Sequence, residues 1–173
     1  MPIRDDILRL AEWWADPGEY KPWPEELISF FEVAEAEQSP TYAEAQKSLT
    51  TLSTGAFVGG AVKHWCGIFA CHVLREAGAN VRWTLLGGKI VGKSANQVKY
   101  VPGNQGLRPG DVAMIPKANH HFIVTGVDYG SNTLWSVDGN TSGQMIRSLT
   151  KQVKYSSQEA ATKTIYGYYR VLA

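Results

Sequence analysis

The stretch HWCGIFACHVLREAG, residues 64–78, places two cysteines and two histidines within fifteen positions. Side chains of these types can bind a metal, form a disulfide, fill an apolar helix or supply a nucleophile. The C-x4-C-H spacing matches neither a C-x2-C zinc knuckle nor a helical pair at positions i and i+4. We therefore expect neither a metal site nor a cofactor here.

The same stretch has the pattern of a helix of about thirteen residues from Cys66 to Gly78, with Gly78 as its left-handed stop. At about 100° per residue, Cys66 falls on the apolar stripe, whereas Cys71, His72 and Arg75 fall on the opposite side. The two cysteines would be about 7.5 Å apart along the helix axis and would point apart. That separation excludes a disulfide between them.

Cys66 would open this helix, and that position suits a nucleophile. A free cysteine usually packs as a small apolar core residue. The first turn of a helix, however, offers unpaired N–H groups and the positive end of the helix dipole, which stabilise a thiolate. We also expect the backbone N–H of Cys66 to be one donor of an oxyanion hole. A thiol nucleophile further needs a base.

Two adjacent histidines in the segment HHFIV offer that base. Because strand side chains alternate between faces, only one of them can face Cys66. The next strand, TLWSVDGN, returns through the DYGSN turn, and a loop of two or four residues puts His121 opposite Asp138 or Asn140. We therefore predict that His121 is the base and that His120 points away. Either Asp138 or Asn140 would orient the imidazole, which gives the arrangement of thiol acyl transfer.

Helical patterns come first along the chain and strand patterns follow. Segments split by prolines precede residue 50, and the Gly-, Ser- and Thr-rich residues 51–60 lead into the cysteine-bearing helix. This order predicts an α+β fold with antiparallel strands. The expected helices before residue 50 are 5–15, 25–37 and 41–49, and the expected strands are 111–115, 121–127, 133–139, 144–150 and 164–172.

The chain has 173 residues, 44% of them hydrophobic and 19% charged, a size that suits one core. We predict a single catalytic domain over 1–173, monomeric, with 1–55 as a helical N-terminal extension and 56–173 as the core. The 17 Lys and Arg are scattered among 16 Asp and Glu, so we expect no nucleic-acid partner. The acidic start MPIRDDILRLAEWW is unlike a signal peptide, and no segment has membrane-spanning length. Synthesis in the cytoplasm without membrane insertion is expected.

The chain resembles the CHAP and NlpC/P60 branch of papain-like cysteine peptidases and amidases. The resemblance spans about residues 62–140 and rests on WCGIFACHVLREAG, LRPGDVAMI, HHFIVTGV and WSVDGNTSG. It implies a papain-like fold, in which the catalytic cysteine opens a helix packed on an antiparallel sheet. The site residues that it implies are Cys66 as nucleophile, His121 as base and Asp138 as orienting residue, with Asn140 assisting; Trp65 and His120 are expected to contact the substrate.

By this resemblance the chain is a cysteine hydrolase that cleaves amide bonds in bacterial peptidoglycan, as an amidase or an endopeptidase. We expect it to act on stem peptides in the cell envelope (periplasm), as a phage lysin or as a toxin delivered between bacteria. An immunity or inhibitor protein would then be a further partner. One alternative is a papain-like toxin that cleaves or deamidates a protein of the target cell. Another is an inactive fold used as a binding module, with Cys66 buried and inert.

Overall fold

A computed structural model of the chain describes residues 3–16, 18–50, 65–115, 120–152 and 165–172. The helices within these ranges are α1 (Ile3–Trp14), α2 (Pro24–Val33), α3 (Tyr42–Thr50) and α4 (Cys66–Glu76). The strands are β1 (Glu19–Tyr20), β2 (Val81–Thr84), β3 (Lys89–Gly92), β4 (Val98–Pro102), β5 (Val112–Ile115), β6 (His120–Asp128), β7 (Thr133–Asp138), β8 (Ile146–Gln152) and β9 (Gly167–Val171).

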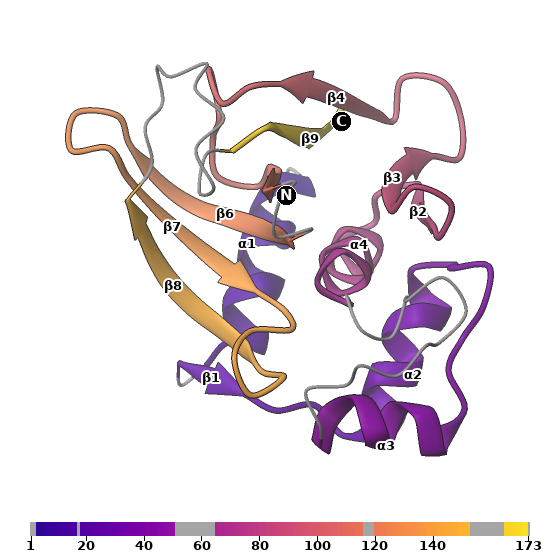
Figure 1. The fold of residues 1–173 in the computed structure, drawn as a ribbon. Helices are drawn as coiled ribbons and strands as arrows, with labels where there is room; N and C mark the ends of the chain where they lie inside the picture. The colour runs from indigo at the N-terminus through magenta and orange to yellow at the C-terminus, as the bar shows by residue number, and fades with distance from the viewer. Residues whose placement is uncertain (1–2, 17, 51–64, 116–119, 153–164, 173) are drawn as a thin grey trace.

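Most of the described strands build one curved sheet with the helices on one side of it (Figure 1). The sheet has seven strands in the order β1-β8-β7-β6-β5-β9-β4, and every neighbouring pair is antiparallel. Strands β2 and β3 pair with each other in a separate hairpin. The predicted α+β fold, with N-terminal helices packed on an antiparallel sheet, is therefore confirmed.

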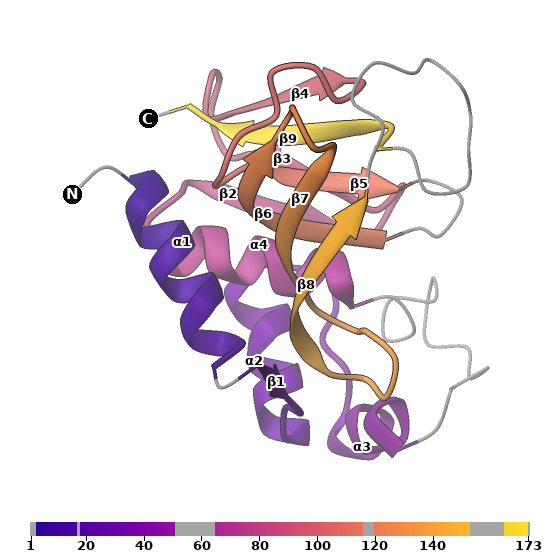
Figure 2. The same ribbon diagram turned by 90° about the vertical axis from the view of Figure 1, so that its left-hand side faces the viewer.

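Alternate residues of the central strands face two different hydrophobic clusters. Ile123 of β6 and Val137 of β7 belong to the main core, which α1, α2 and α4 complete on the helix side of the sheet (Figure 2). Phe122, Val124 and Leu134 belong to a smaller cluster on the opposite face. This two-face division follows from the period of two along a strand, and it decides which side each polar residue of β6 and β7 reaches.

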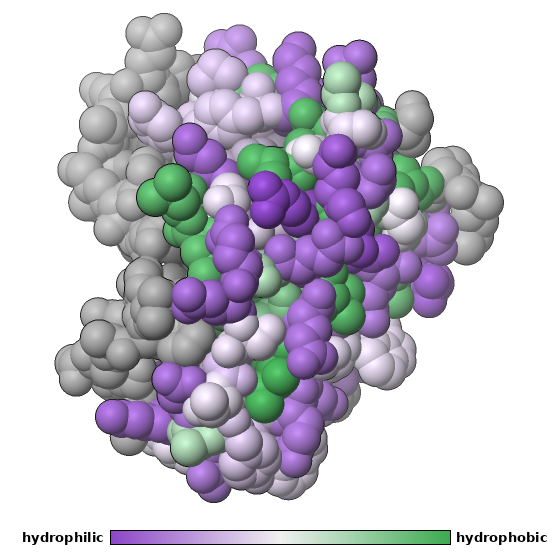
Figure 3. All heavy atoms as spheres, turned by 90° about the vertical axis from the view of Figure 1, so that its right-hand side faces the viewer, coloured by the Kyte–Doolittle hydropathy of each residue, from purple (hydrophilic) through white to green (hydrophobic). Residues whose placement is uncertain are grey.

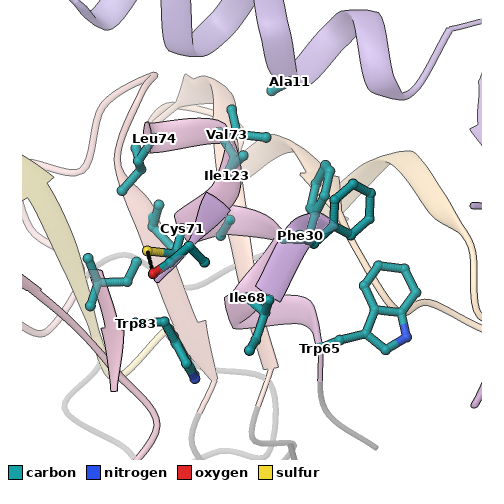
Figure 4. Packing of buried hydrophobic residues seen from close by; sticks show 14 of the residues in the cluster. Ala11, Phe30, Trp65, Ile68, Cys71, Val73, Leu74, Trp83 and Ile123 are labelled. Atoms are coloured by element: carbon teal, nitrogen blue, oxygen red, sulfur yellow. Dashed lines mark hydrogen bonds between the residues drawn. The ribbon is translucent and has the colours of Figure 1, made fainter. Parts of the chain in front are cut away.

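Helix α4 is buried on all sides. It contacts β6 and β2 on one side and α1 and α2 on another, and its residues from Cys66 to Leu74 are all buried. Cys71 and His72, which the periodicity places opposite the apolar stripe of Cys66, are therefore buried as well, because α1 and α2 cover that side of the helix. The Cys71 thiol faces the end of α2, where it donates a hydrogen bond to the carbonyl oxygen of Ala34 at 3.9 Å (Figure 4). The C-terminal end follows the prediction, since Gly78 has a φ of 92°.

Two glycines let the first turns of α4 approach their neighbours closely. A side chain at Gly67 would collide with the ring of Trp83 from the β2–β3 hairpin. A side chain at Gly139, which follows β7, would lie 2.8 Å from the ring of Phe69. The absence of a side chain brings the start of α4 against Trp83 at Gly67 and against the end of β7 at Gly139.

A β-bulge changes the register between β6 and β7. Near the turn, Asp128 pairs with Thr133 and Gly126 pairs with Trp135, so the two residue numbers of each pair sum to an odd number, as predicted. The register shifts between Val124 and Gly126, and beyond it Val124 pairs with Ser136. One additional residue in β6 therefore moves every preceding side chain of this strand to the other face relative to β7.

Hydrophilic and hydrophobic side chains are intermixed on the side of the molecule at the right of Figure 1, which Figure 3 shows face-on. This side includes α2 and the β2–β3 hairpin, where Arg75 and Lys93 both bind the carboxylate of Glu35. In the part of the chain that the structure describes, no helix combines the length and the apolar character needed to cross a membrane.

Candidate active site

The Cys66 thiol lies at the first residue of α4, as the sequence predicts, and its residue is only 2% exposed. Two histidine side chains, those of His120 and His121, hydrogen-bond to it. The thiol therefore meets both adjacent residues at the start of β6, and not just one of them. The amide of Cys66 belongs to the first helical turn, and its expected role in an oxyanion hole stays a prediction.

His120, and not His121, binds the acidic residue. Its Nε2 lies 2.6 Å from Oδ2 of Asp138, and the Asp138 side chain is 1% exposed. The prediction that His121 faces Asp138 while His120 points away is wrong. The bulge near Val124 is the reason, because it puts Asp138 and Ser136 on the face that His120 shares with Phe122.

The charges of this site favour an ion pair between thiolate and imidazolium. Burial by itself opposes a charge on Cys66, but the hydrogen bonds and charges of His120 and His121 outweigh it and lower the pKa of the thiol to about 6. Burial likewise opposes a charge on His120. Its hydrogen bonds to Asp138 and Cys66 prevail and raise the pKa of His120 to about 9. Between these two values the thiolate and the imidazolium coexist.

Asp138 is held in its ionised form by two basic partners. Burial would raise the pKa of its carboxyl, yet the hydrogen bond from His120 and the charge of Lys151 together hold that pKa below its usual range. Lys151 Nζ lies 2.7 Å from each carboxylate oxygen and 2.7 Å from Oγ of Ser136. The ammonium group also lies over the ring of Phe122, 4.6 Å from its centroid.

His121 lies on the helix side of the sheet. Its ring is stacked on Tyr169 at 6.2 Å and lies edge-on to Trp83 at 5.2 Å, both between ring centroids. The residue is 2% exposed, and its Nε2 has no hydrogen-bond partner among the described residues. His121 therefore contacts the thiol from a closed aromatic environment, whereas the His120 side chain is 21% exposed. Of the two, His120 is the one that solvent can reach.

Two further residues, Trp65 and Asn140, were predicted to belong to the site. Trp65 was expected to contact substrate, but it is fully buried and packs on Phe30 in the main core (Figure 4). Asn140 follows β7 with a φ of 55°, and its assistance to the histidine stays a prediction. His64, in the same motif, lies outside the described residues.

Sequence reasoning missed Ser136 and Lys151. Both project to the same face as Asp138, and Lys151 does so from β8, where it pairs with Leu134 of β7. A lysine within a strand normally indicates the solvent-facing side. Its register with β7, which a sequence pattern does not give, is the only signal that could have placed it beside the acid.

The side chains around Cys66 are of the types that nucleophilic chemistry uses. Within the described ranges, no group of three or more His, Cys, Asp or Glu side chains could hold a metal ion. A buried thiol of low pKa, a histidine bonded to it and a carboxylate bonded to that histidine are the elements of covalent acyl transfer.

Comparison with protein-family models, with curated proteins and with solved structures gave no significant match to this chain. The geometry around Cys66 is thus the basis for any assignment of function.

Proposed function

We propose that the protein is a papain-like cysteine hydrolase in which Cys66 is the nucleophile, His120 the base and Asp138 its orienting residue. The observation that carries the proposal is the chain of hydrogen bonds from the Cys66 thiol through His120 to Asp138. The order of the elements supports it, because a cysteine that opens a helix meets an antiparallel sheet whose strands supply the histidine and the acid.

In the acylation step, the Cys66 thiolate attacks the carbonyl carbon of an amide and forms a carbon–sulfur bond, while the carbonyl oxygen takes the negative charge. His120 then gives its proton to the leaving nitrogen, the carbon–nitrogen bond breaks and an amine departs. The product is a thioester on Cys66 and a neutral imidazole at His120. Asp138 holds this imidazole by its Nε2, so the other ring nitrogen is the one that exchanges protons with the thiol and the leaving group.

In the deacylation step, neutral His120 takes a proton from a water molecule. The resulting hydroxide attacks the thioester carbon, the carbon–sulfur bond breaks and a carboxylic acid leaves. The thiolate and the imidazolium are restored together. The exposure of the His120 side chain supports this role, because the base must reach water as well as the thiol.

The substrate class that we propose is the amide bonds of bacterial peptidoglycan. Its support is the resemblance of the motifs around Cys66, His120 and Asp138 to CHAP and NlpC/P60 enzymes. The proposed reaction is cleavage of a stem peptide or of the amide that joins it to the glycan. Action in the cell envelope, with stem peptides as the binding partner, is part of the same proposal.

The test is digestion of purified peptidoglycan by the full chain, with mass analysis of the released fragments. We expect soluble muropeptides with new amine and carboxyl ends from the wild-type protein and none from Cys66→Ala. Intact peptidoglycan combined with rapid labelling of Cys66 by iodoacetamide would shift the substrate to a target-cell protein. Intact peptidoglycan with slow labelling would favour a binding module.

A further inference from the structure

Lys151 carries a largely buried charge that has no part in the proposed reaction steps. Its side chain is 15% exposed, and its ammonium group bonds both oxygens of Asp138 as well as Oγ of Ser136. A lysine gains nothing from burial unless a counter-charge holds it. Here the counter-charge is the same carboxylate that binds His120.

Asp138 therefore has two cationic partners that share one negative charge. Its Oδ2 accepts from His120 Nε2 at 2.6 Å and from Lys151 Nζ at 2.7 Å. During the reaction His120 becomes neutral, when it has given its proton to the leaving group. Without Lys151, the ionised carboxylate would at that moment be buried with no counter-charge, which is a costly state.

We propose that Lys151 is a positioning residue that serves as the second counter-ion of Asp138 and so allows His120 to release its proton during the reaction. The inference rests on the proposed function, in which His120 is the general acid and base. It adds a fourth member to the site, on β8, that acts on the histidine through the carboxylate that both of them bind.

The charged and titratable groups around His120 support this assignment. Among the described residues, Cys66 from α4 and Asp138 from β7 bind His120, Lys151 from β8 binds the same Asp138, and His121 is the neighbour of His120 on β6. The partner on β5, Ile115, is uncharged. Cys66 and Asp138 both raise the pKa of His120. Lys151 is thus the one positive group in this set that offsets the carboxylate.

The test is an NMR titration of the His120 imidazole in the full-length protein, in which Lys151→Met is compared with wild type. We expect the midpoint to rise by about one pH unit or more, because the carboxylate then binds the imidazolium alone. Lys151→Arg, which keeps the charge, should titrate as wild type does. Lys93→Met is the matched control, because it removes a lysine that binds a different carboxylate, that of Glu35. It should leave the His120 midpoint unchanged.

Two more variants keep the test decisive. Lys151→Gln keeps an N–H donor for Asp138 and gives the same rise, even if the Met variant folds poorly. In an Asp138→Asn background, Lys151→Met should raise the His120 midpoint by less than it does with Asp138 present, because only the direct repulsion between the two cations is then relieved. An unchanged or lower midpoint in both Lys151→Met and Lys151→Gln would overturn the inference. Since no substrate is involved, that result is separable from a failure to cleave peptidoglycan.

Discussion

The first and second turns of α4 each bury one cysteine, and the two thiols have opposite properties. Cys66 and Cys71 are both at most 2% exposed. The pKa of Cys66 is lowered to about 6, whereas burial raises the pKa of Cys71 far above its ordinary value. Burial alone is therefore not what makes a thiol inert or reactive.

The difference lies in what each thiol meets. Cys66 contacts two histidines at the start of β6, which stabilise a thiolate. Cys71 donates a hydrogen bond to the carbonyl oxygen of Ala34 and has no histidine partner among the described residues that would offset its burial, which raises the pKa of the thiol. Five residues along one helix thus separate a candidate nucleophile from a core residue, and the comparison can be tested variant by variant.

Replacement of each cysteine by alanine should give the largest difference in turnover between two variants. Cys66→Ala should lower turnover on peptidoglycan by about 10⁶-fold, since it removes the nucleophile. Cys71→Ala should leave turnover near wild type and lower the free energy of unfolding by about 1 kcal/mol, because a small buried group is lost. Turnover is measured by release of muropeptides and stability by urea unfolding. Activity in Cys66→Ala equal to that of wild type would remove the basis for covalent catalysis.

The alanine variants of the two histidines should differ in turnover almost as much as those of the two cysteines. His120→Ala should lose about as much activity as Cys66→Ala, and the double variant little more, because nucleophile and base act as a unit. His121→Ala should lose about tenfold, because the thiol keeps its base but loses one of two hydrogen bonds. The same muropeptide assay measures both. An inactive His121→Ala beside an active His120→Ala would mean that the bulge does not set the face of the base.

Substitution of Asp138 should lower turnover less than loss of Cys66 or His120 does, and it should shift the pKa of His120 downward. Asp138→Asn should lower turnover by about 10²- to 10⁴-fold, within the usual range for general acid–base catalysis. The hydrogen bond to Asp138 raises the pKa of His120 to about 9, so its removal should lower that pKa. The alkaline limb of the pH–rate profile should therefore move to lower pH. A limb that stays near pH 9 would show that Asp138 does not control the base.

The sequence predicts much of the architecture because long amphipathic patterns and turns are local signals. The start of α4 at Cys66, the left-handed stop at Gly78 after its last turn and strands β5 to β9 all follow the pattern. Strands β1 to β4 were missed, because strands of two to five residues offer few alternating positions; β5 is equally short, but the LRPG turn before it marks where it begins.

The site was predicted in its residue types but not in its connections. Cys66 and Asp138 could be named from the helix start and the strand pattern. The choice between His120 and His121 depended on the β6–β7 register, and a single bulged residue inverted it. No local sequence signal marks such a bulge. Lys151 was missed for the same reason, because only the pairing of β7 with β8 brings it beside Asp138.

The pH dependence of iodoacetamide labelling at the two cysteines tests the central claim most directly, since it needs no substrate. The rate at Cys66, followed by mass analysis of the tryptic peptide, should rise with pH around a midpoint of about 6, and His120→Ala should move that midpoint upward. Cys71 in the same protein should stay unlabelled until the chain unfolds. A Cys66 midpoint near the ordinary thiol value of about 8.5, or equal slow labelling of both cysteines, would contradict the account.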